Sequence, residues 1–310
     1  MIIYTDDRDY ADAILPSLNP WTTHDKSAND SNMLELKQRL FPIGTVYKRE
    51  NEKNRKWAQT LIVKHASSSH FDHLIDMSQK DAKLPDRTLC LAGAGQKFHG
   101  QRKRPWAALE GNIHLAVYFS PHRFINKYHT GFPILAAVSL LDALDAFETL
   151  KNRAKIKWVN DILIDGAKVA GFLVHTQSLE DTVLTAILGI GLNVEKTPRI
   201  KIDPFVPNVA CLRDFDQNNS SIDQEKVLFQ LLKSLDKNYD LLLSGKYDVL
   251  LKSYRERSQV IGHHVQVMSD TARKESQEIA SGTVVGIGEN LELILKDHSK
   301  PVTTGRLILT

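Results

Sequence analysis

Two short β-prone runs, residues 162–164 and 169–174, flank the dipeptide Asp165-Gly166. Asp-Gly between two such runs is the strongest local signal for a two-residue β-hairpin, because both positions of that turn favour a positive φ. Just before the hairpin, apolar and lysine side chains alternate over residues 155–158, which is the period of a half-buried strand. The sequence therefore predicts a strand followed by a tight hairpin, and this segment constrains the fold more strongly than any other.

Polar and small residues lie at both ends of this hairpin. Asn160 and Asp161 interrupt the alternation before the hairpin, and Lys168 opens the returning strand ahead of Ala170-Gly171. A lysine followed by a small-residue step lets a cation and the backbone approach a ligand closely. The alternative interpretation of the same residues is an exposed hairpin with a solvated lysine.

Residues 157–162 and 168–171 resemble the central motif of the biotin protein ligases. That motif is Lys-Trp-Pro-Asn-Asp-(Ile/Leu), a short hairpin, and then Lys-(Val/Leu)-Ala-Gly. This chain has every element except the proline, which Val159 replaces, and the spacing from Asp161 to Lys168 also fits. The resemblance extends through four ordered motifs, from about residue 58 to the end of the sequence.

The composition is that of an ordinary globular protein, and it narrows the classes of function. The 310 residues are 42% hydrophobic and 25% charged, and the formal net charge is only +3. Such a small charge implies no general attraction to nucleic acid or membranes, and no apolar run approaches the roughly 18 residues of a membrane span. Because the first residues lack a basic start and a long apolar stretch, we expect no signal peptide and a cytoplasmic protein.

Residues 92–106 are rich in glycine and in basic side chains. Glycines leave backbone N–H groups free to bind an anion, and the cations add charge complementarity. A nucleic-acid patch and a solvated loop are the alternatives. In biotin protein ligases a glycine- and arginine-rich loop that ends in tryptophan occupies this place, and here Trp106 and Gly111-Asn112 follow at the matching distance. The basic or potentially basic side chains are Lys97, His99, Arg102, Lys103 and Arg104.

Three residues of this loop match the family pattern and four depart from it. Gly100, Arg102 and Arg104 match. The departures are Phe98, His99, Gln101 and Lys103. The arginine that Gln101 replaces belongs to the loop that retains the reactive adenylate until the acceptor arrives. Its replacement argues against tight retention, unless Arg102, Lys103 or Lys97 compensates.

Two serines and a glycine-rich strand end supply further candidate contacts. Ser68 and Ser69 precede a predicted helix, where serine side chains cap backbone N–H groups, and we favour that role. In the family the matching turn is Ser-Thr-Asn, whose hydroxyls contact the head group of biotin. Gly189 and Gly191 permit a planar ring to lie against the backbone, and Asn193 carries a donor and an acceptor suited to an adenine edge or a phosphate.

Periodicity along the rest of the chain indicates an α+β protein. We predict strands over residues 58–65, 87–91, 113–119 and 182–194, a core helix over 132–150, a polar loop over 19–32, and a helix that a capping box of Ser221 and Gln224 opens. Short alternating strands predominate after residue 262, which is typical of a small SH3-like barrel. Nothing in residues 1–57 resembles a helix-turn-helix.

The fold implied by the resemblance is a class II synthetase-like mixed sheet flanked by helices, with a small C-terminal SH3-like β-barrel. We expect an N-terminal extension over residues 1–57, which is part of the catalytic domain or unassigned. The ligase catalytic domain would span residues 58–258, and the C-terminal SH3-like domain residues 259–310.

The activity implied by the resemblance joins biotin to AMP, using ATP and Mg²⁺, and then transfers the acyl group to a lysine of an acceptor biotin-carrier domain. The implied catalytic residues are Lys168 and Asp161. The implied biotin contacts are Ser68, Ser69, Gly100, Arg102, Lys168, Gly171 and Gly189. The implied nucleotide contacts are Arg102, Arg104, Trp106, Asn160, Lys168 and Asn193. The sequence names no metal ligand or particular acceptor, and it is compatible with a monomer or a homodimer.

Other functions compete for the same motifs. Lipoate or octanoate ligases of the same superfamily usually carry an Arg-Arg-x-Ser-Gly-Gly-Gly stretch, which this chain lacks. A thiol-dependent acyl transferase needs a nucleophilic cysteine, whereas Cys90 and Cys211 show no helix terminus or histidine partner and are predicted to be structural. A non-catalytic paralogue that binds biotin or an acyl-protein is favoured by Val159, Phe98 and Gln101.

Overall fold

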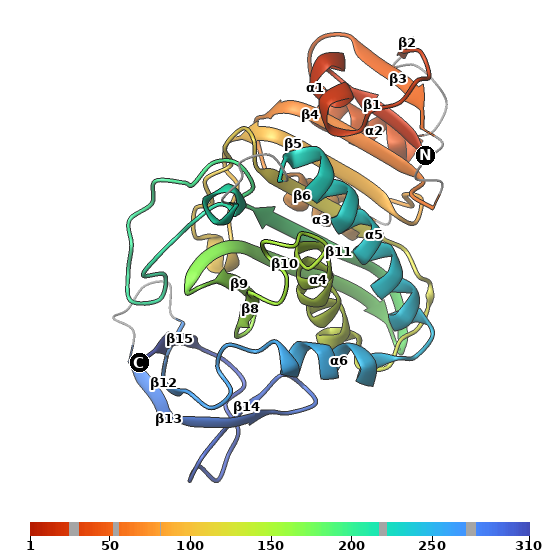
Figure 1. Cartoon of the computed structure of the whole chain (residues 1–310). Coiled ribbons are helices and arrows are strands. Elements are labelled where there is room, and N and C mark those ends of the chain that lie inside the picture. Colours follow the sequence, from red (N-terminus) through yellow and green to blue (C-terminus); the bar gives the residue numbers. More distant parts are fainter. Residues whose placement is uncertain (25–30, 52–55, 81, 217–221, 271–276) are drawn as a thin grey trace.

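A large mixed sheet forms the centre of the molecule, and a smaller sheet lies at its C-terminal end (Figure 1). The computed structural model describes residues 1–24, 31–51, 56–80, 82–216, 222–270 and 277–310. The order of the large sheet is β2-β3-β1-β4-β5-β6-β11-β10-β9-β8, and β7 pairs with β11. Pairing is parallel between β1 and β4 and between β4 and β5, and antiparallel elsewhere. The predicted mixed sheet is confirmed.

The strands of the large sheet carry the following bounds. They are β1 Ile2–Thr5, β2 Thr22–His24, β3 Val46–Glu50, β4 Gln59–Ala66, β5 Thr88–Gly95, β6 Ile113–Phe119, β7 Arg123–Phe124, β8 Ala154–Lys157, β9 Asp161–Ile164, β10 Ala167–Leu179 and β11 Thr182–Leu192. The helices are α1 Arg8–Ile14, α2 Ser31–Leu40, α3 His70–Gln79, α4 Tyr128–Leu144, α5 Gln224–Leu243 and α6 Tyr247–Glu256.

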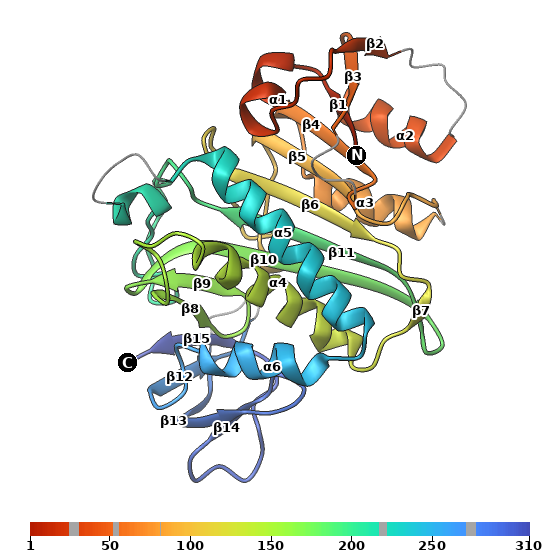
Figure 2. The same cartoon turned by 45° about the vertical axis from the view of Figure 1, so that its right-hand side comes forward.

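Helices cover both faces of the sheet, so its central strands are apolar on both sides (Figures 1 and 2). On β6, Leu115 and Val117 join the core under α4, α5 and α6, whereas Ala116 and Tyr118 join the core under α2 and α3. This alternation follows from the period of two along a strand.

The C-terminal sheet contains β12 His264–Met268, β13 Glu278–Ile287, β14 Leu293–Leu295 and β15 Arg306–Leu309. Its order is β14-β13-β12-β15. A barrel closes only when its two edge strands pair. Among the described residues, β14 instead forms a single bridge with Val302 and does not pair with β15. A small antiparallel C-terminal sheet is therefore present, but the predicted closed barrel is not, and the domain predicted over residues 259–310 stays a prediction.

Several element boundaries differ from the sequence predictions. The helix predicted over residues 132–150 ends at Leu144, and the chain continues in i+3 turns that keep Phe147 and Leu150 buried. The apolar period of about three thus extends beyond the α-helix. Helix α5 begins at Gln224, and the carboxylate of its N-cap residue Asp223 accepts from the Lys226 N–H. Ser221 itself lies outside the described residues.

The N-terminal segment is more structured than the sequence indicated. Strand β2 lies within the predicted polar loop 19–32, because its residues pair with β3 across the sheet edge; residues 25–30 of that loop lie outside the described residues. Strand β1 pairs with both β3 and β4. Residues of the N-terminal segment therefore extend the central sheet, while the boundary predicted at residue 57 stays a prediction.

Candidate active site

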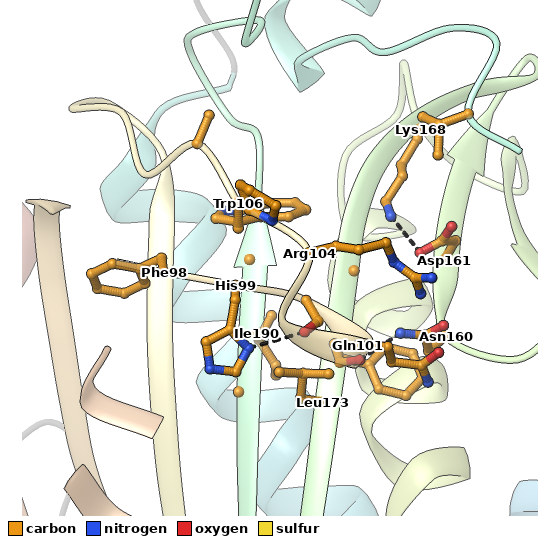
Figure 3. Close-up of a pocket in the computed structure, with 18 of the residues that line it drawn as sticks. Phe98, His99, Gln101, Arg104, Trp106, Asn160, Asp161, Lys168, Leu173 and Ile190 are labelled. Carbon is orange, nitrogen blue, oxygen red and sulfur yellow. Dashed lines mark hydrogen bonds and ion pairs between the residues drawn. The ribbon is translucent and has the colours of Figure 1, made fainter. Parts of the chain in front are cut away.

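A cavity of about 650 Å³ lies over β6, β10 and β11. Backbone and small side chains of β11, including Gly189 and Gly191, line one wall. Residues 98–101 and 104–107, which belong to the basic loop (residues 92–106) or directly follow it, line another. Residues 198–206 and the start of β15 complete it. Figure 3 shows the loop crossing these strands, with Phe98 at the opposite end of the view from Lys168. The cavity thus joins elements that are far apart in the sequence.

Lys168 and Asp161 form an ion pair at one side of this cavity. The Lys168 Nζ lies 2.5 Å from Asp161 Oδ1, and each side chain is about one-fifth exposed. The turn Asp165-Gly166 joins their strands with φ of 49° and 82°, which confirms the predicted hairpin. The Lys168 backbone is held on its other side, since its N–H donates to Asn208 and its carbonyl accepts from Ala210. The cation is therefore directed into the site by a fixed backbone (Figure 3).

A second lysine at this site was missed by the motif interpretation. Lys157, the last residue of β8, lines the cavity and is buried. Its ammonium donates to the Phe205 carbonyl. Burial lowers the pKa of Lys157, and the nearby Lys168 charge lowers it further, while Asp161 opposes the shift. The alternation over residues 155–158 indicates that Lys157 faces solvent. In the structure Lys157 is buried instead, because segment 198–206 covers that side of the strand.

The side-chain amide nitrogens of Asn160 and Asn193 each donate a hydrogen bond that holds the side chain in place. Asn160 Nδ2 donates to the Phe172 carbonyl at 2.8 Å. Asn193 Nδ2 donates to the Ala210 carbonyl at 3.1 Å, while its Oδ1 is buried without a hydrogen-bond partner. An unsatisfied buried oxygen is uncommon in proteins. Both residues line the cavity, and their predicted contact with a nucleotide stays a prediction.

Aromatic side chains of the protein itself lie over the two glycines of β11. A Cβ on Gly191 would stand 2.4 Å from the Trp106 indole, and one on Gly189 would stand 3.0 Å from the Phe71 ring. Rings of the protein itself, from the basic loop and from α3, thus occupy the space over this backbone, and contact of a ligand with these glycines stays a prediction. Trp106 also borders the cation, because its ring centre is 5.8 Å from Lys168 Nζ.

The basic loop contributes fewer cations to the cavity than predicted. Gly100 and Arg104 line it, but Arg102 does not: its side chain is 62% exposed, and it faces Asp270. Arg104 Nη1 is 2.9 Å from the same carboxylate. The reason lies in the loop backbone, which turns through a positive φ at Arg102 and directs that side chain outward.

Two loop residues are instead tied to helix α3. His99 Nε2 lies 2.8 Å from Asp72, and Lys103 Nζ lies 3.1 Å from the same carboxylate. The two residues that replace an arginine and a glycine of the family pattern thus fasten the loop to the helix. No motif marked Asp72, because its partners lie 27 and 31 positions away.

The two serines before α3 have different positions. Ser69 is buried, lines the cavity and stands at the N-cap of α3, but its side chain makes no capping hydrogen bond. Ser68 does not line the cavity, and its hydroxyl lies 2.7 Å from His73 Nε2. The predicted capping is therefore wrong for both side chains, because one turns toward the cavity and the other toward His73. Of the two candidate biotin contacts, only Ser69 reaches the site.

The C-terminal sheet also reaches this cavity through Arg306 of β15. Its guanidinium stacks 3.6 Å from the centre of the Phe205 ring and lies 3.5 Å from Asp203 Oδ2. Arg306, Asp203 and Phe205 all line the cavity. No sequence motif marked them, because Arg306 belongs to a short alternating strand that looked like ordinary sheet.

The described residues give little support for catalysis by a cysteine thiol or by a metal centre. Cys90 and Cys211 are both buried and unpaired by disulfides, and burial raises the pKa of each thiol. Over the described ranges, no three His, Cys, Asp or Glu side chains gather as a metal centre would require. In the same part of the chain no helix has the length and apolarity needed to cross a membrane.

Comparisons with known proteins place this architecture in a family. The family model described as "Biotin/lipoate A/B protein ligase family" matches residues 74–193. A biotin–[acetyl-CoA-carboxylase] ligase of Paracoccus denitrificans is 33% identical over 199 residues, which cover 64% of this chain and 79% of that protein. The chain therefore belongs to the biotin protein ligase family.

Two further comparisons define how far the likeness extends. The bifunctional ligase/repressor BirA of Bacillus subtilis (strain 168) is 29% identical over 188 residues, and the match covers 60% of this chain but only 56% of that protein. A biotin protein ligase from Aquifex aeolicus, solved in complex with biotin and ATP, has a TM-score of 0.61 at 20% identity. That match covers 81% of this chain and 98% of the Aquifex chain, and it supports the fold.

Proposed function

We propose that this protein attaches biotin to a lysine of an acceptor carrier protein, with ATP as the second substrate and biotinyl-AMP as the intermediate. The observation that carries the proposal is the Lys168–Asp161 pair, held 2.5 Å apart at the wall of a cavity of about 650 Å³. Both residues stand in the motif that this chain shares with the family. Pockets of this size are typical of small-molecule and cofactor sites.

The first step joins two anions and needs a cation between them. A carboxylate oxygen of biotin attacks the α-phosphorus of ATP, and the bond from that phosphorus to the bridging oxygen of pyrophosphate breaks. Pyrophosphate leaves with the electron pair. Lys168 supplies positive charge beside the crowded phosphoryl oxygens, and such preorganised charge lowers the barrier most where water is excluded. Lys157 adds a second cation close by.

The second step transfers the acyl group to an amine. The neutral nitrogen of the acceptor lysine attacks the acyl carbon, the bond from that carbon to the phosphate oxygen breaks, and AMP leaves. The amine gives up a proton as the amide forms. Asp161 is the nearest carboxylate to Lys168 in the cavity wall, and we assign it to orient the incoming amine and accept that proton.

The remaining lining residues divide between the two substrates. On the nucleotide side we place Arg104, Trp106, Asn160, Lys168 and Asn193, and the unpaired Oδ1 of Asn193 supports an adenine or ribose donor there. On the biotin side we place Ser69, Gly100, Gly171 and Gly189, with Leu173 and Ile190 as apolar surface. Ser68 and Arg102 are left out, because neither lines the cavity.

Magnesium enters this scheme with the nucleotide. The described residues offer no group of three metal-ligating side chains, so they do not fit a resident metal centre. Mg²⁺ commonly binds through substrate phosphates and keeps most of its waters. We therefore write the nucleotide substrate as MgATP and derive no step through a protein-bound metal.

The N-terminal residues belong to the catalytic domain in this proposal. Strands β1 and β3 extend the central sheet, and α1 and α2 each pack on one of its two cores. This packing supports a role in extending the sheet. The C-terminal domain from about residue 259 contributes Arg306 to the cavity.

Exchange of labelled pyrophosphate into ATP tests the proposal, because only a carboxylate that is adenylated reversibly supports it. We expect exchange that depends on biotin. Exchange that depends on lipoate or octanoate instead would assign the chain to the sister activity. Absence of exchange with all three acids, alongside biotin binding by calorimetry, would show a binding protein rather than a ligase.

A further inference from the structure

His114 is a buried side chain beneath the basic loop that none of the assigned roles uses. It lies on β6, is 2% exposed and lines the cavity. In the strand register it stands directly opposite Gly191 of β11. Cross-strand partners present their side chains on the same face of the sheet. The His114 imidazole therefore flanks the space that Gly191, which has no side chain, leaves for the Trp106 indole.

The hydrogen bonds of His114 fix which nitrogen carries the proton. Nε2 lies 3.0 Å from the Leu109 carbonyl, which accepts only, so Nε2 is the N–H. Nδ1 is then the acceptor, and the Trp106 Nε1–H donates to it at 3.4 Å. Burial lowers the pKa of His114 to about 4, which keeps the ring neutral and the acceptor available near neutral pH.

Trp106 needs such a constraint because it is only half-buried and ends a loop. Its backbone N–H donates to the Phe98 carbonyl at 3.0 Å, which fixes the chain but not the ring. The indole lies over Gly191 on one side and 5.8 Å from Lys168 Nζ on another. Rotation of this ring would move it into the space beside the catalytic cation.

We infer that His114 is a positioning residue, which acts through Trp106 to hold the indole plane against Gly191 and keep the space beside Lys168 open for the nucleotide. The kinetic part of this inference rests on the proposed ligase function. The geometric part concerns only the side chains of this chain.

Two substitutions separate the two hydrogen bonds of His114. His114→Asn places an amide oxygen where Nδ1 stands, so it keeps an acceptor for Trp106 and loses the donor to Leu109. His114→Gln places its amide where Nε2 stands, so it keeps the donor to Leu109 and loses the acceptor for Trp106. The protein has four tryptophans. The Trp106 indole N–H resonance is identified in a ¹⁵N–¹H spectrum by its loss in Trp106→Phe.

We expect His114→Gln to move the Trp106 indole resonance and to raise KM for ATP by about two- to ten-fold, the factor that one hydrogen bond is worth, with little change in kcat. His114→Asn should restore both readings to nearly the wild-type values. In a Trp106→Phe background, His114→Gln should add nothing further to KM.

The opposite pattern overturns the inference. Equal effects of Asn and Gln, or a larger effect of Asn, would show that His114 serves the Leu109 turn rather than Trp106. An unchanged indole resonance in a folded His114→Gln protein would do the same. If the wild-type protein shows no biotin-dependent exchange, the proposed function fails, but the resonance still decides whether His114 positions the indole.

Discussion

Charged side chains that line a cavity strengthen its hydrogen bonds to a bound anion. Gln101 lines the cavity but carries no charge, while Arg102 points outward and pairs with Asp270. Only Arg104 of the loop arginines lines the site, and it too is paired with Asp270. The loop therefore offers an anion in the cavity less free positive charge than its composition suggests.

Gln101→Arg should lengthen the retention of the acyl-adenylate, because a guanidinium at a lining position adds a charge-assisted hydrogen bond to the phosphate. We expect dissociation of labelled adenylate from the protein to slow by about ten-fold, a factor equivalent to roughly 1.4 kcal/mol. Gln79→Arg, at the exposed end of α3, adds the same charge outside the cavity and serves as the control. Equal retention in the two variants would remove Gln101 from the site.

Residue identity was more predictable than residue direction. Ten of the site residues predicted by motif line the cavity, namely Ser69, Gly100, Arg104, Trp106, Asn160, Asp161, Lys168, Gly171, Gly189 and Asn193. Ser68 and Arg102 do not line the cavity, because the local backbone conformation of a loop decides whether a side chain points inward. A sequence pattern holds no information on that conformation unless glycine or proline marks it.

At the scale of elements, the hairpin and the glycine strand are the parts that local chemistry determines. The hairpin turn needs two positive φ angles, which Asp-Gly supplies at low cost, so its position could be predicted from two residues. The basic loop carries no such rule. Its course is set by His99 and Lys103 binding to Asp72, and by Arg104 binding to Asp270, which are long-range contacts.

Gly191→Ala and Gly166→Ala form a matched pair on these two elements. A Cβ at Gly191 would stand 2.4 Å from Trp106, so the indole must move and KM for ATP should rise. At Gly166 nothing lies within 4 Å, and the cost is the positive φ of 82° alone, about 1 kcal/mol of unfolding free energy. Steady-state kinetics and urea unfolding distinguish the two effects. A Gly166→Ala variant with the larger rise in KM would contradict this assignment.

At the scale of the whole molecule, the cavity depends on parts that no motif marked. Segment 198–206 and Arg306 close it from the C-terminal side, and the Trp158 indole donates to the Leu291 carbonyl at 2.6 Å between the two sheets. Sequence patterns predicted both sheets but not their contact, because such contacts join residues more than 100 positions apart. The C-terminal sheet was predicted as a closed barrel because alternation indicates strands but does not determine whether the edge strands β14 and β15 pair.

Two buried histidines should make the stability of the whole protein depend on pH. Burial lowers the pKa of His70 to about 3 and of His114 to about 4, from an ordinary value of 6.5. Below pH 6.5 the unfolded chain therefore binds protons that the folded chain does not. As the pH decreases below 6.5, the unfolding free energy therefore decreases by about 1.4 kcal/mol per pH unit for each histidine. This loss ends when the pH approaches the pKa of that histidine in the folded protein.

Urea unfolding of the wild type and of His114→Gln at pH 7 and pH 5 measures this dependence. We expect the loss of stability between the two pH values to be smaller in the variant by about 2 kcal/mol, because one of the two histidines no longer titrates in the unfolded state. The comparison cancels the contribution of carboxylates. An identical loss in both proteins would mean that His114 is accessible to protons when folded.

The most direct test of the whole account is the biotin-dependent exchange rate of Lys168→Ala beside that of Lys155→Ala. Both lysines lie on the same three-stranded hairpin segment, but only Lys168 lines the cavity and contacts Asp161. We predict that Lys168→Ala lowers exchange by about 10²- to 10³-fold, as the loss of one preorganised charge does, while Lys155→Ala retains the wild-type rate. Full exchange in a folded Lys168→Ala protein would contradict the central role given to this cation.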